Sequence, residues 1–360
     1  MHVLVGVIGG ALVALMLLEI FLTYLLPRRV KRDPRIVRSV FAFAWRPWRT
    51  MVRKLPGQTA DTLLGIYGPL FLVLNLVLWV AVMMFGYACL QWAGGSNLAP
   101  VRPVTFGQDL YFSAATMVST GTAGLSAQDA FARVVQVIDA ASGLGVLAIV
   151  IGYLPALYQA FSEREATVSQ LDARAGSPPS AGRLVIRSTE RGGWPAINNY
   201  LGSWEQWVAE LMESHLSYPV LSYFRSQHLN QSWLATMCTV LDACALTICA
   251  APTGTVDSSR FTFAIARHAV ADLSYTLHVH PTPPASDRLP REHLEELVRQ
   301  LQEAGAPPAS DIDTVALRLE RTRALYEPYL NALSKRLELA LPQWLEPESA
   351  TDNWRTTAWH

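Results

Sequence analysis

The chain has 360 residues, of which 51% are hydrophobic and 16% are charged. This composition is too apolar for an ordinary soluble protein and too charged for a protein that lies wholly within a membrane. The formal net charge is zero, so the overall balance gives no indication of a nucleic-acid partner.

The first segment, Val3–Leu26, is apolar except for Glu19. About 20 apolar residues suffice to cross a bilayer, so we predict a transmembrane helix over residues 1–26. Residues 27–54 are strongly basic, and Asp33 is their one acid. Short basic loops stay on the cytoplasmic side of a membrane. The N-terminus is therefore expected outside and this basic segment inside.

The basic segment also has a helical pattern. At about 100° per residue, five of its arginines fall within an arc of about 80°, namely Arg35, Arg38, Arg46, Arg49 and Arg53. Aromatic residues such as Trp45 and Trp48 lie off that arc. The pattern predicts an amphipathic segment on the inner leaflet that binds anionic lipids. A simple topology anchor is the alternative.

A second span is predicted over Leu63–Trp92, followed by a polar external loop. Thr105 and Gln108 then fit a capping box at a helix start. The helix that follows, Phe106–Val118, would be about 20 Å long, which is too short for a hydrocarbon core of about 30 Å. We therefore predict a re-entrant helix rather than a span.

The sequence after this short helix is polar and rich in glycine, and a long apolar helix follows over Ala130–Tyr158. Irregular backbone at membrane depth survives only where protein buries it or where it lines a water-filled cavity. Ser126 and Asp129 are suited to cap the long helix. Gly143 and Gly145 near its middle permit either bending or close helix packing. Residues 61–160 thus form one predicted membrane module.

The rest of the chain is predicted to be helical and soluble. Residues 161–197 are expected to form a helical extension and a linker at Gly176–Gly182, since this stretch is rich in Gly, Pro and Ser. Residues 198–345 form the predicted helical cytosolic domain, and residues 346–360 a tail. The apolar part of Gln231–Ala251 is short for a span, so we interpret it as a core helix. The cysteine spacing there does not indicate a metal site.

The stretch Asp109–Tyr153 resembles the pore domain of the tetrameric potassium-channel superfamily. Asp109–Ser113 (DLYFS) is similar to the start of that family's pore helix, and Ser119-Thr120-Gly121 to the first half of its Thr-Val-Gly-Tyr-Gly-Asp filter. Phe131 and Arg133 open the next helix as in the family, and Gly143 falls at the hinge glycine. The basic loop and the sequence after residue 152 resemble a bacterial subgroup with a helical tail.

The second half of the filter differs from the family. Thr122-Ala123-Gly124 stands where the family has Tyr-Gly-Asp. Ala123 meets a backbone conformation that a residue with a Cβ resists, unless a one-residue shift lets Gly124 serve as the second glycine. Gly124 also removes an acid at the outer mouth, which Asp129 is expected to replace in part.

The resemblance implies an ion pathway and its supporting residues. The backbone carbonyls and hydroxyls of the loop would line the pathway and replace the hydration shell of K⁺ or Na⁺; the loop residues are Ser119, Thr120, Gly121, Thr122, Ala123 and Gly124. Asp139 would face either the cavity, as an attractive charge, or the back of the pore helix, as a structural acid. Gly143 and Gly145 would form the gating hinge.

The fold class that follows is an all-α membrane protein with three spans, one pore helix and a helical cytosolic domain per subunit. The expected function is a homotetrameric channel for monovalent cations in the plasma membrane, with no cofactor beyond the ions. The alternative is a non-conducting membrane scaffold or sensor that retains the fold. A third hypothesis, an enzyme in the helical domain, ranks last because the sequence contains no nucleophile elbow, P-loop or Cys-x-x-Cys motif.

Overall fold

A computed structural model of the chain describes residues 2–25, 36–100, 103–121, 124–227 and 230–345. The described part is almost entirely helical, as predicted. It divides into two compact units, Met1–Tyr158 and Gln159–His360, which we call the N-terminal unit and the helical unit. One long helix, α5, begins in the first and ends in the second.

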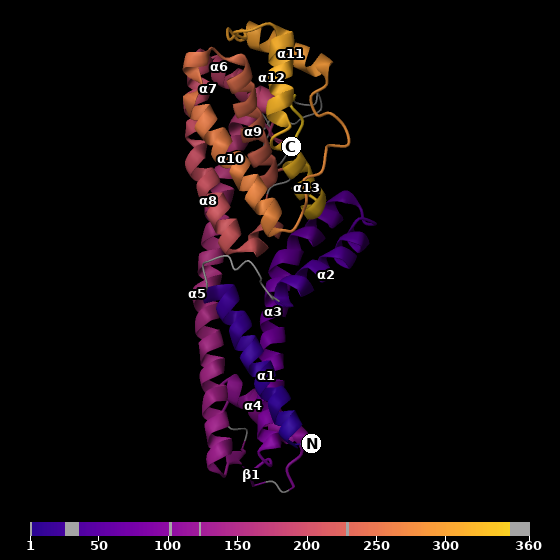
Figure 1. The fold of residues 1–360 in the computed structure, drawn as a ribbon, viewed down its shortest axis with the longest axis vertical. Coiled ribbons are helices and arrows are strands. Elements are labelled where there is room, and N and C mark those ends of the chain that lie inside the picture. Colours follow the sequence, from indigo (N-terminus) through magenta and orange to yellow (C-terminus); the bar gives the residue numbers. More distant parts are fainter. Residues whose placement is uncertain (1, 26–35, 101–102, 122–123, 228–229, 346–360) are drawn as a thin grey trace, which may run out of the picture. The chain divides into compact units, whose positions relative to one another are not determined.

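The N-terminal unit contains long helices, one short helix and a minimal pair of strands (Figure 1). Their bounds are α1 His2–Ile20, which continues as the π-helical turn Phe21–Leu25, α2 Ile36–Val52, α3 Gly57–Ala93, α4 Phe106–Met117 and α5 Ala130–Ala175, with the strands β1 Leu98–Ala99 and β2 Ser126–Ala127. The strands pair antiparallel, with Leu98 opposite Ala127. The short α4 lies beside α3 and α5, as the predicted re-entrant helix requires (Figure 1).

Three helices of this unit are long and apolar enough to cross a membrane, and they correspond to the three predicted spans. Glycines bring α1 and α3 into close contact. A Cβ atom on Gly9 would lie 2.6 Å from the carbonyl oxygen of Gly86, and one on Gly86 would lie 2.8 Å from Cγ2 of Val13. Small residues at such a crossing are typical of helix packing in membranes, where van der Waals contact rather than the hydrophobic effect drives association.

The amphipathic helix α2 packs its aromatic residues against the start of α3. Trp45 is only 1% exposed, and its ring centroid lies 4.6 Å from that of Tyr67. The indole N–H of Trp48 donates to the carbonyl of Leu63 at 3.2 Å. This helix runs through Pro47, which we expect to bend it because proline removes one main-chain hydrogen bond.

The helical unit is a bundle built around one buried helix. Its remaining elements are α6 Ala181–Thr189, α7 Gly193–Gly202, α8 Trp204–Ser217, the 3₁₀ helix Pro219–Tyr223, α9 Trp233–Ala250, the 3₁₀ helix Thr253–Thr255, α10 Asp257–Thr276, α11 Arg291–Glu303, α12 Ile312–Arg323 and α13 Glu327–Leu337. Helix α9 is packed against α6, α7, α10, α12 and α13. It is apolar and long enough to count as a fourth candidate span, but 94% of it is buried within the protein. It is the core helix that the sequence predicted.

Two predictions about this part of the chain are wrong. The stretch 176–182 is not a linker, because it is buried for the most part and Gly182 N–H donates to the carbonyl of Trp344 at 2.9 Å. The helical unit accordingly begins at Gln159 and not at Asn198. Residues 312–337 form two helices, since Pro328 near the start of α13 cannot continue the hydrogen-bond ladder of α12.

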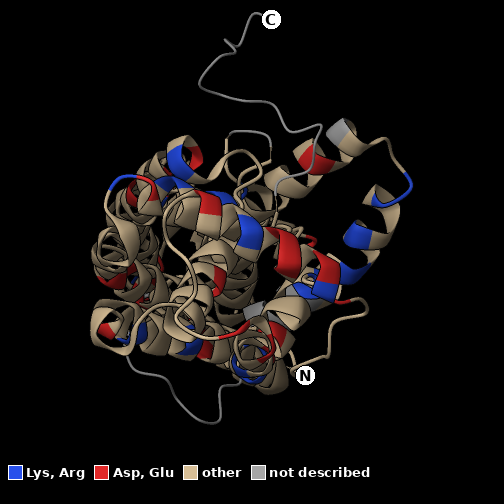
Figure 2. Cartoon of the chain, turned by 90° about the horizontal axis from the view of Figure 1, so that it is seen from above, with Lys and Arg blue, Asp and Glu red and all other residues tan. Residues whose placement is uncertain are grey.

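Charged residues of both signs are interspersed over the helices seen in Figure 2. Several of them form pairs along α11, for example Arg299 with Glu296 and Arg291 with Glu295. A surface of this kind is typical of a protein region in water. The surface of the helical unit is therefore more charged than that of the apolar, membrane-length helices of the N-terminal unit.

Candidate functional site

The candidate site consists of α4, the loop 118–125 and the first half of α5, where the sequence predicts a re-entrant unit. Helix α4 begins as the capping pattern predicts, with the side-chain oxygen of Gln108 accepting the N–H of Thr105 at 2.8 Å. Its 12 residues make it about 18 Å long, which is well short of a span. Phe112, which is 1% exposed, anchors it in a small apolar cluster with Leu98 and Leu125.

The end of α4 is a Schellman-type turn that leads directly into the loop. Ser119 N–H donates to the carbonyl of Thr116 at 3.1 Å, and Thr120 N–H donates to that of Ala115 at 3.0 Å. Ser119 takes the left-handed position with φ 57°, where glycine is the usual residue. The hydroxyl of Thr120 donates to the carbonyl of Ala115 as well, at 3.2 Å.

The loop is exposed from Val118 through Gly121 and again at Gly124. Gly121 and Gly124 have φ angles of 104° and 75°, which favour glycine, and a Cβ on either would meet no atom within 4 Å. Whether Gly124 corresponds to the second filter glycine or to the acid that follows it stays a prediction. Thr122 and Ala123 lie outside the described residues.

A small network of hydrogen bonds joins the loop after α3 to the first turn of α5. Asp129 caps α5, with one carboxylate oxygen accepting the N–H of Ala132 at 2.7 Å. Its other oxygen accepts the side-chain amide of Asn97 at 2.5 Å. Hydrogen bonds from the main-chain N–H of Ala132 and from the side chain of Asn97 hold the pKa of Asp129 below its usual range. Asp129 thus joins the loop after α3 to the start of α5, and its role at an outer mouth stays a prediction.

Helix α5 contacts α4 at two successive turns. Asp139, only 2% exposed, accepts a hydrogen bond from the hydroxyl of Ser113 at 2.7 Å. One turn further along both helices, a Cβ on Gly143 would lie 2.1 Å from the carbonyl oxygen of Met117. Asp139 therefore faces α4, and its role as a cavity charge or as a structural acid stays a prediction.

The two predicted hinge glycines differ in their surroundings. Gly143 is a close-packing position at the end of α4, whereas a Cβ on Gly145 would meet nothing within 4 Å. Any bend at Gly143 would have to move Met117 and with it the start of the loop. The hinge role of both residues stays a prediction.

Three further polar contacts in this unit were missed by sequence reasoning. Ser96 donates to the buried carboxylate of Asp109 at 2.6 Å, so an apparently ordinary pore-helix residue is an internal acid. The amide of Gln91 donates to the carbonyl of Ala132 at 3.1 Å. The hydroxyls of Tyr87 and Ser142 share a bond of 2.6 Å. Polar residues within apolar helices were the available signal for Gln91 and Ser142.

The predicted lipid-binding arginines lie on or beside α2. Arg46 and Arg53 are exposed, and Arg49 is half-buried. Phe43 and Met51 beside them are 76% and 51% exposed. Arg35 lies outside the described residues, as does the side chain of Arg38.

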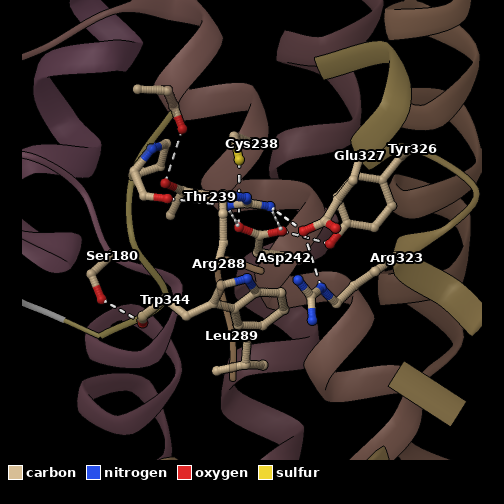
Figure 3. A network of polar contacts seen from close by, with 12 residues as sticks. Ser180, Cys238, Thr239, Asp242, Arg288, Leu289, Arg323, Tyr326, Glu327 and Trp344 are labelled. Atoms are coloured by element: carbon tan, nitrogen blue, oxygen red, sulfur yellow. Dashed lines mark hydrogen bonds and ion pairs between the residues drawn. The ribbon is translucent and has the colours of Figure 1, made fainter. Parts of the chain in front are cut away.

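The helical unit has its own polar core (Figure 3). Arg288 donates to both carboxylate oxygens of Asp242, at 2.8 and 3.0 Å, and to Glu327 at 2.7 Å. Arg323 donates to the same Glu327 at 3.0 Å. Tyr326 donates its hydroxyl to Asp242 at 2.5 Å. Burial, and next the negative charge of Asp242, raise the pKa of Tyr326, so its hydroxyl remains a donor.

This network is structural. Its buried acids and arginines balance in charge and are hydrogen-bonded to one another. Its members come from α9, the segment before α11, α12 and α13, so it ties the C-terminal segments to the core helix. We expect a buried network of this kind to fix how these segments are arranged around the core helix.

A second buried cation holds the end of α5 in the helical unit. Arg164 is 3% exposed and donates to the carbonyls of Leu221 and Phe224, both at 3.0 Å. Its guanidinium also lies 3.2 Å from Nε2 of His215. Since Nδ1 of His215 donates to the carbonyl of Leu211 at 2.9 Å, Nε2 is the acceptor for Arg164.

Comparison with known proteins gives one informative similarity. The chain is 22% identical over 280 residues to the uncharacterized membrane protein YdjJ of Bacillus subtilis (strain 168), and the aligned region covers 76% of this chain and 78% of the relative. The chain matches no protein-family profile and no solved structure. Together with the apolar helices described above, the similarity identifies the chain as an all-helical membrane protein.

Proposed function

We propose that the chain is the subunit of a homotetrameric channel that conducts monovalent cations through a pathway lined by residues 119–124. The observation that carries the proposal is the re-entrant unit: a 12-residue helix, then an exposed polar loop, then a return through a helix of 46 residues. Within a bilayer such a loop needs protein or water around it. A ring of copies around a central pathway supplies both.

The short helix supports passage of cations in particular. The carboxyl end of a helix carries partial negative charge, and α4 ends directly at the loop. Hydroxyls and main-chain carbonyls are the hard oxygen ligands that alkali cations require. The loop 119–124 is rich in both.

The surface of α5 supports association of several copies. Its most apolar window is only 17% buried within one chain. Large exposed side chains recur along it: Phe131, Val134, Val137, Ile138, Leu144, Leu147 and Ile151. In the proposed tetramer this stripe contacts lipid tails and the α5 helices of the other copies.

The proposed orientation places the N-terminus and β1 outside and the basic segment inside, in the plasma membrane. In the structure, the N-terminus and β1 lie at the same end of the N-terminal unit (Figure 1), because α1 and α3 run antiparallel. Helix α2 would then lie on the cytoplasmic leaflet with Phe43 and Met51 among acyl chains and Arg46 and Arg53 at anionic headgroups. The helical unit would be cytoplasmic.

The test is cation flux through the purified full-length protein in liposomes, with potassium, sodium and a large organic cation compared. We expect potassium and sodium to pass and the organic cation to be excluded. The variant with Ala123→Gly and Gly124→Asp restores the family's filter pattern, so its potassium-to-sodium ratio should rise. Absence of flux at every voltage, pH and divalent-ion condition would instead favour a non-conducting scaffold.

A further inference from the structure

Two buried carboxyl groups of the N-terminal unit have no ion-pair partner among the residues that the structure describes. Asp109 is 0% exposed and Asp139 is 2% exposed. Each accepts a hydrogen bond from one serine hydroxyl, and its other oxygen, Oδ1, has no hydrogen-bond partner within the described part of the chain. Burying an ionised carboxylate without a cation is far more costly than one neutral hydrogen bond can offset, so such a group takes up a proton instead.

Asp139 has the more informative surroundings of the two. From α3 the nearby titratable group is the phenol of Tyr87, which bonds to Ser142. From α4 it is the carboxyl of Asp109, one helical turn before Ser113. On α5 itself, Arg133 donates to the carbonyls of Ala127 and Gln128 at the outer end of the helix. Among the residues that the structure describes, no positively charged side chain pairs with Asp139.

The position of Asp139 links it to the loop. Ser113 and Met117 lie on successive turns of α4, and their contacts Asp139 and Gly143 lie on successive turns of α5. Ser113 and Met117 are as far apart in the sequence as Asp139 and Gly143, so the two helices run side by side in the same direction here. They form a two-point clamp on the last turns of α4, immediately before Ser119. Asp139 is the polar half of this clamp.

We propose that Asp139 is a proton-binding site behind the loop 119–124, with the proton held on the carboxyl oxygen that has no partner. As the neutral acid, Asp139 accepts the Ser113 bond and stays in its apolar surroundings. On release the O–H bond breaks, its electron pair stays on the carboxylate oxygen, and the proton passes to water. The uncompensated charge then favours solvation over burial, which opens the clamp and loosens the loop. The effect on ion passage rests on the proposed function; the proton site does not.

The proton itself can be detected without any flux. The test is infrared spectroscopy of the full-length protein in liposomes, in the C=O stretching region of protonated carboxyl groups. We expect a band at neutral pH that Asp139→Asn removes in part, leaving the remainder to Asp109. Asp129→Asn serves as the matched control and should leave the band unchanged, because Asp129 is an ionised helix cap. Identical neutral-pH bands in the wild type and in Asp139→Asn would overturn the proposal.

The consequence for ion passage is tested by the potassium-to-sodium flux ratio between about pH 5 and about pH 9, since burial can shift a carboxyl titration by several units. We expect the wild-type ratio to fall several-fold as pH rises. Asp139→Asn cannot lose a proton and keeps an acceptor for Ser113, so its ratio should stay constant at the acidic wild-type value. Asp311→Asn, at the exposed cap of α12 in the helical unit, should keep the wild-type profile. An unchanged pH profile in Asp139→Asn would contradict the coupling, whereas absence of flux with the infrared band present would count against the channel and leave the proton site standing.

Discussion

The two units of this protein bury acidic side chains in opposite ways. In the helical unit, Asp242 and Glu327 lie against the guanidinium groups of Arg288 and Arg323. In the N-terminal unit, Asp109 and Asp139 are equally buried but receive only serine hydroxyls from the described residues. The first arrangement keeps the carboxylates ionised and fixed. In the N-terminal unit, an ionised Asp109 or Asp139 would lack a neutralising cation among the described residues, so the carboxyl group must either bind a proton or move to where water solvates it.

The two units also differ in how their helices pack against one another. Helices of the N-terminal unit approach through glycine, at Gly9 with Gly86 and at Gly143 with Met117. The core helix α9 of the helical unit instead buries large apolar side chains of its own, such as Trp233 and Leu241. In water the hydrophobic effect rewards large buried side chains, whereas in lipid close backbone contact drives association. Asp109 and Asp139 both lie on the two helices that flank the proposed ion pathway.

The largest loss of stability is expected when the buried acids Asp242 and Glu327 lose an arginine partner. Arg288→Met would leave Asp242 and Glu327 buried without their shared cation. Removing one partner of a buried ion pair typically costs about 3–5 kcal/mol. Hydrogen exchange of α9 peptides in the full-length protein measures the loss as faster exchange.

Arg299→Ala is the matched control for this prediction, because Arg299 pairs with Glu296 and Glu303 on the exposed surface of α11. It should leave α9 exchange unchanged, since exposed pairs contribute little. Equal protection in the Arg288→Met variant would show that the network does not stabilise the helical unit.

The next effect concerns the glycine contact between α4 and α5. Gly143→Ala places a methyl group against the carbonyl of Met117 and should destabilise the N-terminal unit by about 1–3 kcal/mol, as overpacking does. Gly145→Ala is the matched control, since its methyl group meets open space and alanine favours the helix. The comparison is made by thermal unfolding in detergent. Equal melting temperatures for the two variants would refute the close contact.

Several of these features were predictable from the sequence and others were not. The three spans, the short α4, its Gln108 cap and the core character of α9 follow from length, periodicity and capping chemistry, which are local. The role of Gly143 in packing and the serine partners of Asp109 and Asp139 depend on which helix lies opposite, and one sequence does not contain that information. The supposed linker at 176–182 failed for the same reason, because Trp344, far along the chain, covers it.

In the helical unit, a buried histidine is expected to make the free energy of unfolding depend on pH. Burial, and next the charge of Arg164, lower the pKa of His215 well below its usual range. The unfolded chain therefore binds this proton more readily than the folded one, and the free energy of unfolding should fall as pH drops below about 6.5. Denaturant unfolding at about pH 7 and about pH 5 measures it. His215→Gln should reduce that slope and the exposed His268→Gln should not; equal slopes in all three proteins would refute the assignment.

The smallest effect is expected at the membrane surface. Replacing Arg46 and Arg53 by Gln removes two exposed charges from the face of α2 proposed to meet anionic lipid. Each should weaken retention of anionic lipid roughly five-fold, measured by native mass spectrometry of the protein purified with anionic lipid. Lys335→Gln, in the helical unit, is the control. Unchanged lipid retention would leave α2 as a topology anchor only.

The most direct measurement is the conductance of Ser119→Cys in a planar bilayer before and after a charged thiol reagent is added. Ser119 is exposed at the start of the loop, and the native cysteines, Cys89, Cys238, Cys244 and Cys249, are all buried, so the wild type serves as the control. The account predicts that the reagent blocks the current of Ser119→Cys and leaves that of the wild type intact. A Ser119→Cys current that the reagent modifies no more than the wild type would contradict it, because ions would then bypass the loop.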